Sequence, residues 1–279
     1  MATKLIIVEG LPGSGKSTTA KMVYNNLKDS GMAAELFSEG DYNHPADYDG
    51  VAYFSNMDFE ILRKNNFDNK NVIDDIKIKY LDGYLIPYRK AIEEKLISPE
   101  DKLFQDIVQK DVYELPLDLH MKLIFSRWKG FVDRAINEDK VIIFECCFIQ
   151  NPVTVTMVRN NTLKEVTMNY INSLNQIIKP LDPILIYVDQ KDIQLSFTKV
   201  VAERPSEWFE GFKYYYLSQG YGLNKGLKGL DGIIEILNAR KVLEQEIYKS
   251  LQLKKYYIDN SEFRIDIQKD NINSILSGI

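Results

Sequence analysis

The chain has 279 residues, of which 45% are hydrophobic and 27% charged, and its formal net charge is −5. A chain of this size can bury a large core, either as one α/β domain or as a core domain with an insertion. The scattered basic residues and small negative charge argue against a nucleic-acid-binding protein, and no apolar stretch is long enough to cross a bilayer.

The N-terminus and the cysteines indicate the compartment. The first strand begins almost at residue 1, which leaves no room for a signal peptide. The two cysteines, Cys146 and Cys147, are adjacent and follow a buried-looking strand, which suits reduced core thiols better than a disulfide framework or a metal site. We therefore expect a cytoplasmic protein that binds a small molecule, with neither nucleic acid nor a membrane as partner.

A phosphate-binding loop is predicted near the start of the chain. Residues 4–8 form an aliphatic run typical of a buried parallel strand, and residues 18–29 have the apolar spacing of a helix. Between them, residues 10–17 read GLPGSGKS and match the pattern G-x-x-x-x-G-K-[ST]. Glycines allow turns that aim successive backbone N–H groups at a phosphate, and the helix N-terminus adds partial positive charge.

This loop predicts a nucleotide site with ATP and Mg²⁺ as cofactors, although GTP is also compatible with it. Lys16 is expected to reach the β- and γ-phosphates, and the Ser17 hydroxyl is expected to bind Mg²⁺. The alternative is a glycine-rich turn that binds nothing. The predicted nucleotide contacts are Gly10, Pro12, Gly13, Ser14, Gly15, Lys16, Ser17 and Thr18.

An acidic segment follows the second predicted strand, residues 33–38. Residues 39–45 read EGDYNHP, and the carboxyl ends of strands in an open parallel sheet face the ligand crevice. Asp41 is therefore our candidate general base, which would accept the proton of a substrate hydroxyl. The alternative is that Asp41 and Asn43 only shape a turn before Pro45.

The remaining patterns predict a three-layer α/β fold with a five-stranded parallel sheet. One helix is expected to begin near Thr162, whose hydroxyl and Glu165 have the spacing of a capping box. Residues 49–137 show helical patterns and no convincing strand, so we predict a helical insertion that caps the acceptor site within a single domain, residues 1–279. The later strands are predicted over residues 141–145, 184–188 and 255–258.

These motifs carry a resemblance. The phosphate loop followed by G-D-x-x-H-P at residues 40–45 resembles the small-metabolite kinases of the P-loop kinase superfamily, particularly gluconate kinase, and adenylylsulfate kinase has a related acid there. The resemblance implies that Asp41 and His44 contact the phosphoryl acceptor. Residues 123–128, LIFSRW, are similar to a thymidylate kinase helix whose arginine faces the nucleotide acceptor, which implies the same role for Arg127.

The third strand departs from those families. Thymidylate kinases continue it into Asp-Arg and deoxynucleoside kinases into Glu-Arg-Ser, whereas this chain reads Glu145-Cys146-Cys147. The missing arginine argues against a nucleotide acceptor. Glu145 is left as an acid near Mg²⁺ and its waters, as an alternative base, or as a charge satisfied by a neighbouring helix N-terminus. Arg127 lies in an apolar helical stripe, so it must pair, face a cleft or extend to solvent.

A lid is predicted over residues 203–231, because phosphoryl transfer needs more positive charge than one lysine supplies. The preceding helix ends at Glu203-Arg204-Pro205, where an arginine-bearing lid begins in the resembling kinases, so Arg204 is our candidate for a second charge clamp. Residues 220–229 are glycine-rich enough to move. Their lysines either reach the phosphates on closure or belong to a solvated loop.

Three functions are compatible with these features. The first is an ATP-dependent kinase acting on a hydroxyl of a small molecule, such as a sugar-like metabolite, an antibiotic or a sugar nucleotide, with Lys16, Asp41, Arg204 and Glu145 as catalytic residues. The second is a nucleoside or nucleoside monophosphate kinase. The third is a regulatory NTPase, against which stands the lack of an N-K-x-D string. The chain is expected to act as a monomer or homodimer.

Overall fold

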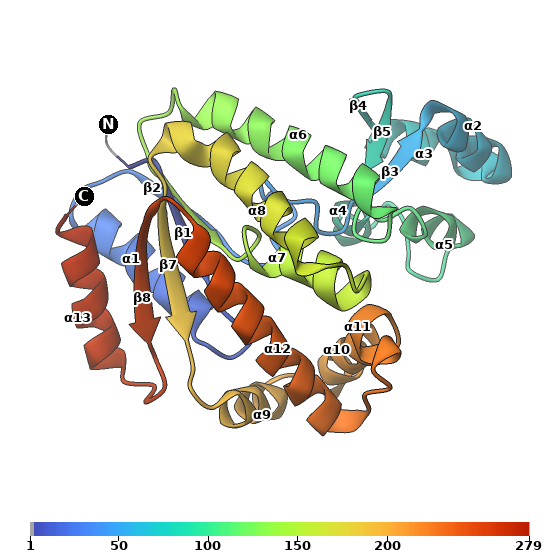
Figure 1. Cartoon of the computed structure of the whole chain (residues 1–279). Helices are drawn as coiled ribbons and strands as arrows, with labels where there is room; N and C mark the ends of the chain where they lie inside the picture. The colour runs from blue at the N-terminus through green and yellow to red at the C-terminus, as the bar shows by residue number, and fades with distance from the viewer. Residues whose placement is uncertain (1–2, 279) are drawn as a thin grey trace. The chain divides into compact units, whose positions relative to one another are not determined.

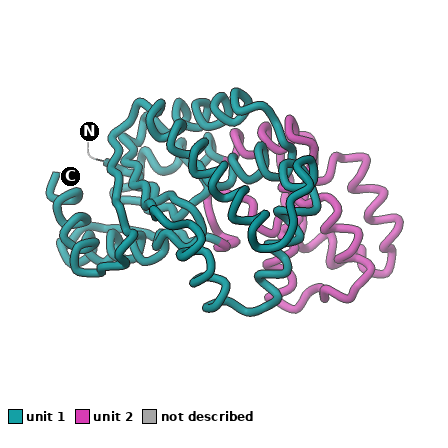
Figure 2. The backbone as a smooth tube through the Cα atoms, turned by 60° about the horizontal axis from the view of Figure 1, so that its bottom comes forward, with its two compact units in different colours: residues 1–39, 128–279 teal, residues 40–127 magenta. Residues whose placement is uncertain are grey.

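The computed structural model describes residues 3–278, which divide into two compact units. Unit 1 contains the residues up to 39 and those from 128 onward, and unit 2 contains residues 40–127 (Figure 2). Unit 2 corresponds to the insertion predicted over residues 49–137, but it starts and ends earlier. Residues 1–2 and 279, which belong to the predicted domain of residues 1–279, lie outside the described residues.

Unit 1 is built on a five-stranded, all-parallel sheet, as predicted (Figure 1). Its strand order is β2-β6-β1-β7-β8, so β1 lies in the centre between β6 and β7. The three central strands, β6, β1 and β7, are rich in β-branched and aliphatic residues and are buried on both faces, whereas the edge strands β2 and β8 are partly exposed. Their bounds are β1 Leu5–Glu9, β2 Ala34–Phe37, β6 Val141–Glu145, β7 Ile184–Asp189 and β8 Lys254–Asp259.

Helices cover both faces of this sheet and give it three layers. On one face, α1 (Lys16–Asp29) and α13 (Ile265–Leu276) enclose a core of alternate strand residues (Figure 1). On the other face, Trp128 and Phe131 from the end of α6 (Leu117–Ala135) pack on Phe144, and α12 (Gly229–Ser250) packs on β7 through Tyr187 and Tyr248. Unit 1 is therefore a three-layer α/β fold, with the loop of residues 10–15 between its central strand β1 and the helix α1.

The start of α8 (Lys164–Ile178), which packs against α12, differs from the prediction. The helix begins two residues later than expected, and the Thr162 hydroxyl has no hydrogen-bond partner within the described residues, so the predicted capping box is wrong. The reason is the preceding segment, where α7 (Gln150–Val153) continues into a π-helical turn, Thr154–Arg159. The Thr162 N–H donates to the Thr156 carbonyl at 2.9 Å and so completes that turn instead of opening α8.

Unit 2 contains helices, as predicted, and also a small antiparallel sheet that was not predicted. The sheet has the order β3-β5-β4 and packs against α2 through residues such as Phe59, whose ring stacks on Tyr84 at 4.1 Å. Strands of three or four residues are too short to show alternation, so the sequence gives little sign of them. The elements are β3 Ala52–Ser55, α2 Asn56–Asn65, α3 Lys70–Ile76, β4 Ile78–Tyr80, β5 Gly83–Ile86, α4 Tyr88–Glu93, α5 Lys102–Val108 and the first part of α6.

The segment predicted as a lid, residues 203–231, is helical and packed. It follows α9 (Ile193–Glu203) and forms α10 (Ser206–Leu217), α11 (Gly220–Asn224) and the start of α12. Aromatic side chains of α10 pack on Phe197 and on each other, with the Phe212 and Tyr216 rings stacked at 4.0 Å. Gly220 has φ +44° and lies so close to the Val158 carbonyl that a Cβ would approach it to 2.1 Å. Residues 220–224 are therefore held in place and do not form a solvated loop.

A fully buried ion pair joins α12 to its neighbours in unit 1. The Arg240 guanidinium donates to Glu244 Oε1 at 2.7 and 3.1 Å and to the Thr154 hydroxyl at 3.0 Å. The other carboxylate oxygen of Glu244 accepts from the Tyr187 hydroxyl at 2.9 Å. Because both charges are excluded from water, each depends on the other for compensation.

We expect Arg240→Met to lower the free energy of unfolding by about 3–5 kcal/mol, because it leaves the Glu244 carboxylate buried without its counter-charge. The matched control is Lys164→Met. This substitution removes an exposed ion pair between Lys164 on α8 and Glu246 on α12, and it should barely change stability. Urea unfolding of both variants measures the difference. Equal losses in the two variants would contradict the role of the buried pair.

Candidate functional site

The loop between β1 and α1 requires glycine at three positions. Gly10, Gly13 and Gly15 have φ values of 149°, 84° and 97°, which L side chains rarely adopt. Neighbouring atoms also leave no room for a side chain. A Cβ would lie 2.2 Å from the Val188 carbonyl at Gly10 and 2.8 Å from the Ser196 carbonyl at Gly13. The three glycines of the sequence pattern thus stand at positions where the backbone conformation and the close neighbours exclude any larger residue.

Side chains from the end of the chain hold this loop. The Asn260 amide, directly after β8, donates to the Ser14 carbonyl at 2.8 Å. Gln268 on α13 donates to the Thr19 hydroxyl at 2.6 Å, and Thr19 in turn donates to the Gly15 carbonyl. Sequence reasoning missed both residues, because no local pattern links position 260 or 268 to the loop.

The loop presents positive potential at the N-terminus of α1. The first helical bond runs from the Thr19 N–H to the Gly15 carbonyl at 3.0 Å, so helix geometry leaves the N–H groups of residues 15–18 without intrahelical partners. Lys16 is buried and its ammonium group lies 3.5 Å from the Leu11 carbonyl, while Ser17 and Thr18 are exposed. Free N–H groups, the helix dipole and a lysine together form an anion-binding site.

Ser17 and Glu145 meet at the edge of this site. The Ser17 hydroxyl donates to Glu145 Oε1, although the residues are 128 positions apart. Glu145 ends β6, which pairs with β1 in a register that sets Glu145 opposite Val8. A hydroxyl and a carboxylate in contact are hard oxygen donors of the kind that Mg²⁺ takes from proteins beside phosphate oxygens and water. The residues present therefore fit Mg²⁺.

Glu9 is a buried acid that sequence reasoning missed. It is fully buried at the end of β1, and its two carboxylate oxygens accept the backbone N–H groups of Phe148, Ile149 and Gln150 at 2.7, 2.8 and 3.0 Å. Burial raises the pKa of Glu9 to about 7, against the lowering effect of the three N–H bonds. One feature of the sequence could have indicated Glu9. It is the only charged residue in the otherwise aliphatic strand β1, and a buried charge must be compensated.

These bonds hold a strained turn that follows Glu145. Cys146 and Cys147 have φ values of 59° and 72°, in the left-handed region that non-glycine residues rarely occupy. Both side chains are buried and neither forms a disulfide, and burial raises the pKa of the Cys146 thiol, so it stays protonated. By anchoring the residues after this turn, Glu9 helps to set the direction in which the chain leaves Glu145.

Asp41, His44 and Arg127 all belong to unit 2. Asp41 shapes the turn that was the alternative reading, since its side chain accepts the Asn43 N–H and its carbonyl accepts the His44 N–H, both at 2.9 Å. The Asp41 side chain is nevertheless partly exposed. Its role as a base remains a prediction.

Arg127 fastens the same segment from α6. It donates to the His44 carbonyl at 2.7 Å, and its guanidinium lies 4.7 Å from the centre of the Tyr48 ring. His44 is buried, and burial, with Arg127 adding to the effect, lowers its pKa to about 3, so the imidazole is neutral. Its Nδ1 accepts the Ala46 N–H at 3.1 Å. The Arg127 guanidinium thus contacts a backbone carbonyl and an aromatic ring, and the described residues include no carboxylate that pairs with its charge.

Arg204 lies at the end of α9 in unit 1. It is exposed, and its guanidinium lies 5.9 Å from the centre of the Trp208 ring. The preceding turns of α9 reach the phosphate loop, because Ser196 and Val200 are the residues nearest to Gly13. Within unit 1 the structure thus brings Lys16, Ser17 and Glu145 together and connects Arg204 to them through α9.

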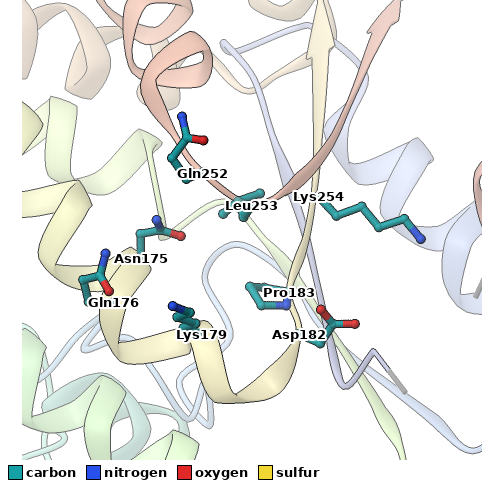
Figure 3. A pocket seen from close by; sticks show the side chains of 8 residues that line it. All are labelled: Asn175, Gln176, Lys179, Asp182, Pro183, Gln252, Leu253 and Lys254. Carbon is teal, nitrogen blue, oxygen red and sulfur yellow. The ribbon is translucent and has the colours of Figure 1, made fainter. Parts of the chain in front are cut away.

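A separate polar pocket lies at the other end of the sheet. It has a volume of about 470 Å³ and is bordered by the residues that precede β7 and begin β8, at their amino ends (Figure 3). The phosphate loop lies at the carboxyl end of β1, so this pocket belongs to a different part of unit 1. Its lining residues are Asn175, Gln176, Lys179, Asp182, Pro183, Gln252, Leu253 and Lys254.

Comparisons with known proteins give a likeness to solved structures but not to a described family. No family model and no curated protein matches the chain. Among solved structures, it is similar to the thymidylate kinase from Candida albicans, at 13% identity and a TM-score of 0.45, over 99% of this chain and 92% of that chain. Within residues 3–278, no helix has the length and apolar character needed to cross a membrane.

As pH rises from about 4.5 to 7, we expect the free energy of unfolding of wild type to fall relative to that of a Glu9→Gln variant. Glu9 keeps its proton in the native state up to a pKa of about 7, whereas its ordinary value is 4.5, so the native state binds more protons across this window. Urea unfolding at pH 5, 6, 7 and 8 measures the effect. The exposed Glu246→Gln should reproduce the wild-type pH dependence, and a Glu9→Gln profile parallel to wild type would contradict the assignment.

Proposed function

We propose that this chain is a kinase that transfers the γ-phosphoryl group of ATP to a hydroxyl group of a small molecule. The observation that carries the proposal is the glycine loop held between β1 and α1, with Lys16 inside it and the Ser17–Glu145 contact beside it. Loops of this kind bind the phosphates of nucleoside triphosphates.

Each candidate site residue of unit 1 has a role in this proposal. The backbone N–H groups of the loop and the Lys16 ammonium bind the phosphates and offset the negative charge that spreads over the transferred group. Ser17 and Glu145 would hold Mg²⁺, which when bound neutralises the β- and γ-phosphate oxygens. Arg204 is proposed as a second cationic clamp, because α9 leads from the loop to it.

The acceptor side of the proposal rests on unit 2. Asp41 is proposed as the base that accepts the proton of the acceptor hydroxyl, while Glu145 serves the metal site. Arg127 and His44 then position the Asp41 segment through the bond between the Arg127 guanidinium and the His44 carbonyl, instead of contacting the acceptor themselves. We also propose that the enzyme acts in the cytoplasm as a monomer or homodimer.

A nucleoside monophosphate acceptor is the second candidate, favoured by the arginine-bearing stretch at residues 123–128. The third, a regulatory NTPase, would transfer the phosphoryl group to water. Acceptor dependence separates these candidates, because a kinase releases ADP only when its acceptor is present.

The test is ADP release across sugars, amino sugars, aminoglycoside-type antibiotics, nucleosides and nucleoside monophosphates. We expect one class to stimulate release, and Lys16→Ala to abolish the stimulated rate and weaken nucleotide binding, because the same ammonium contacts ground and transition states. Release that no acceptor changes would favour the NTPase. A Lys16→Ala variant with the normal rate would overturn the proposal.

Asp41→Asn should lower turnover with the accepted substrate by about two to four orders of magnitude, since a positioned base contributes roughly that factor. The KM for ATP should barely change, because Asp41 is proposed to touch only the acceptor. Steady-state kinetics measure both, with the exposed Asp68→Asn in the same unit as control. Unaltered turnover would remove Asp41 from the mechanism.

A further inference from the structure

Gln150, the first residue of α7, is held at two points. Its backbone N–H donates to Glu9 Oε2 at 3.0 Å, and its side-chain amide donates to Glu39 Oε1 at 2.7 Å. The residue is 8% exposed, so more than nine-tenths of it is removed from solvent. Glu39, in contrast, is exposed.

The contact with Glu39 sets the orientation of the Gln150 amide. A carboxylate only accepts hydrogen bonds, so the NH₂ group of Gln150 must face Glu39 and the carbonyl Oε1 must face away from that oxygen. Oε1 is buried and receives no hydrogen bond from the residues that the structure describes. A buried acceptor without a donor is costly, and a ligand that supplies an O–H or N–H group removes that cost.

The pair lies at the ligand end of the sheet. Glu39 follows β2 by two residues and Gln150 follows β6 by five, and these two strands are neighbours, with Phe37 opposite Phe144. Both residues therefore lie at the carboxyl ends of adjacent parallel strands, where ligands bind in open α/β sheets. The phosphate loop lies at the same end, after the next strand, β1.

The charges at this end select the ligand. Glu39 and Gln150 offer acceptor oxygens, one of them anionic, and Glu145 ends β6, the strand that Gln150 follows. An anionic group placed against Glu39 would be repelled, whereas hydroxyl and ammonium groups would be attracted. Lys16, a cation of the neighbouring phosphate loop, is committed to the phosphates of the nucleotide in the proposed function.

We propose that Glu39 and Gln150 form the recognition site for the phosphoryl acceptor, and that the acceptor is a neutral or cationic polyhydroxy compound, such as a polyol or an amino sugar. This inference rests on the proposed function and specifies its substrate class. The acceptor donates one hydrogen bond to Gln150 Oε1 and another to the Glu39 carboxylate. A nucleoside monophosphate, which brings a phosphate dianion, does not fit this pair.

The test measures the steady-state kinetics of wild type and three variants with ATP and a polyhydroxy acceptor. Glu39→Gln removes the charge, and Gln150→Met removes the amide at similar volume. Each should raise the KM for the acceptor by about tenfold or more, because a hydrogen bond to a charged or buried group is lost. Equilibrium binding of an ATP analogue should stay within about twofold. Gln176→Met, in the pocket at the amino end of the sheet, is the matched control and should match wild type.

The outcomes separate this inference from the proposed function. Two outcomes would overturn the recognition site while leaving the proposed kinase activity valid. One is wild-type activity restricted to nucleoside monophosphates, and the other is an acceptor KM that neither Glu39→Gln nor Gln150→Met changes. If no acceptor stimulates ADP release, the proposed function fails. The site is then tested by binding, because polyols and amino sugars should raise the thermal unfolding midpoint of wild type but not of Glu39→Gln, and equal shifts would refute it.

Discussion

The site depends on the close approach of three glycines to the backbone and side chains around them. Gly10 lies against the Val188 carbonyl, Gly13 against α9 and Gly15 against the Asn260 amide, so the loop is enclosed by β7, α9 and the segment after β8. These contacts all come from residues far from the loop in sequence, between positions 188 and 260. The loop that they enclose leads into the first turn of α1, whose N–H groups and Lys16 are the features with which such loops bind anions.

A second constraint is the placement of acids at the ends of neighbouring strands. Glu9 ends β1 and Glu145 ends β6, yet their surroundings give them different tasks. Three backbone N–H groups hold Glu9 within the core, where it anchors the turn after Glu145, while Glu145 contacts the Ser17 hydroxyl at the edge of the site. The buried acid thus positions the other one, and the strained Cys146–Cys147 turn between them is stabilised by the same bonds.

Much of unit 1 could be predicted from the sequence, because a phosphate loop and buried parallel strands have strong local patterns. The five strands were found within one or two residues, and Glu145 was correctly placed at the end of the third, while its contact with Ser17 was found only in the structure. What was missed depends on distant contacts. Nothing near Asn260 indicates that it holds Ser14, and the start of α8 was displaced by a π-helical turn. The strands of unit 2, with three or four residues each, are too short to show a period.

The central proposal for this molecule is that residues 10–17 bind the phosphates of a nucleotide beside the contact between Ser17 and Glu145. The most direct measurement is a crystal structure of the full chain with a non-hydrolysable ATP analogue and Mg²⁺. We expect phosphate oxygens within hydrogen-bond distance of the N–H groups of residues 13–18 and of Lys16 Nζ, with the metal ion between Ser17, Glu145 and the phosphates. A nucleotide bound elsewhere, or a loop that stays empty at saturating nucleotide, would contradict it.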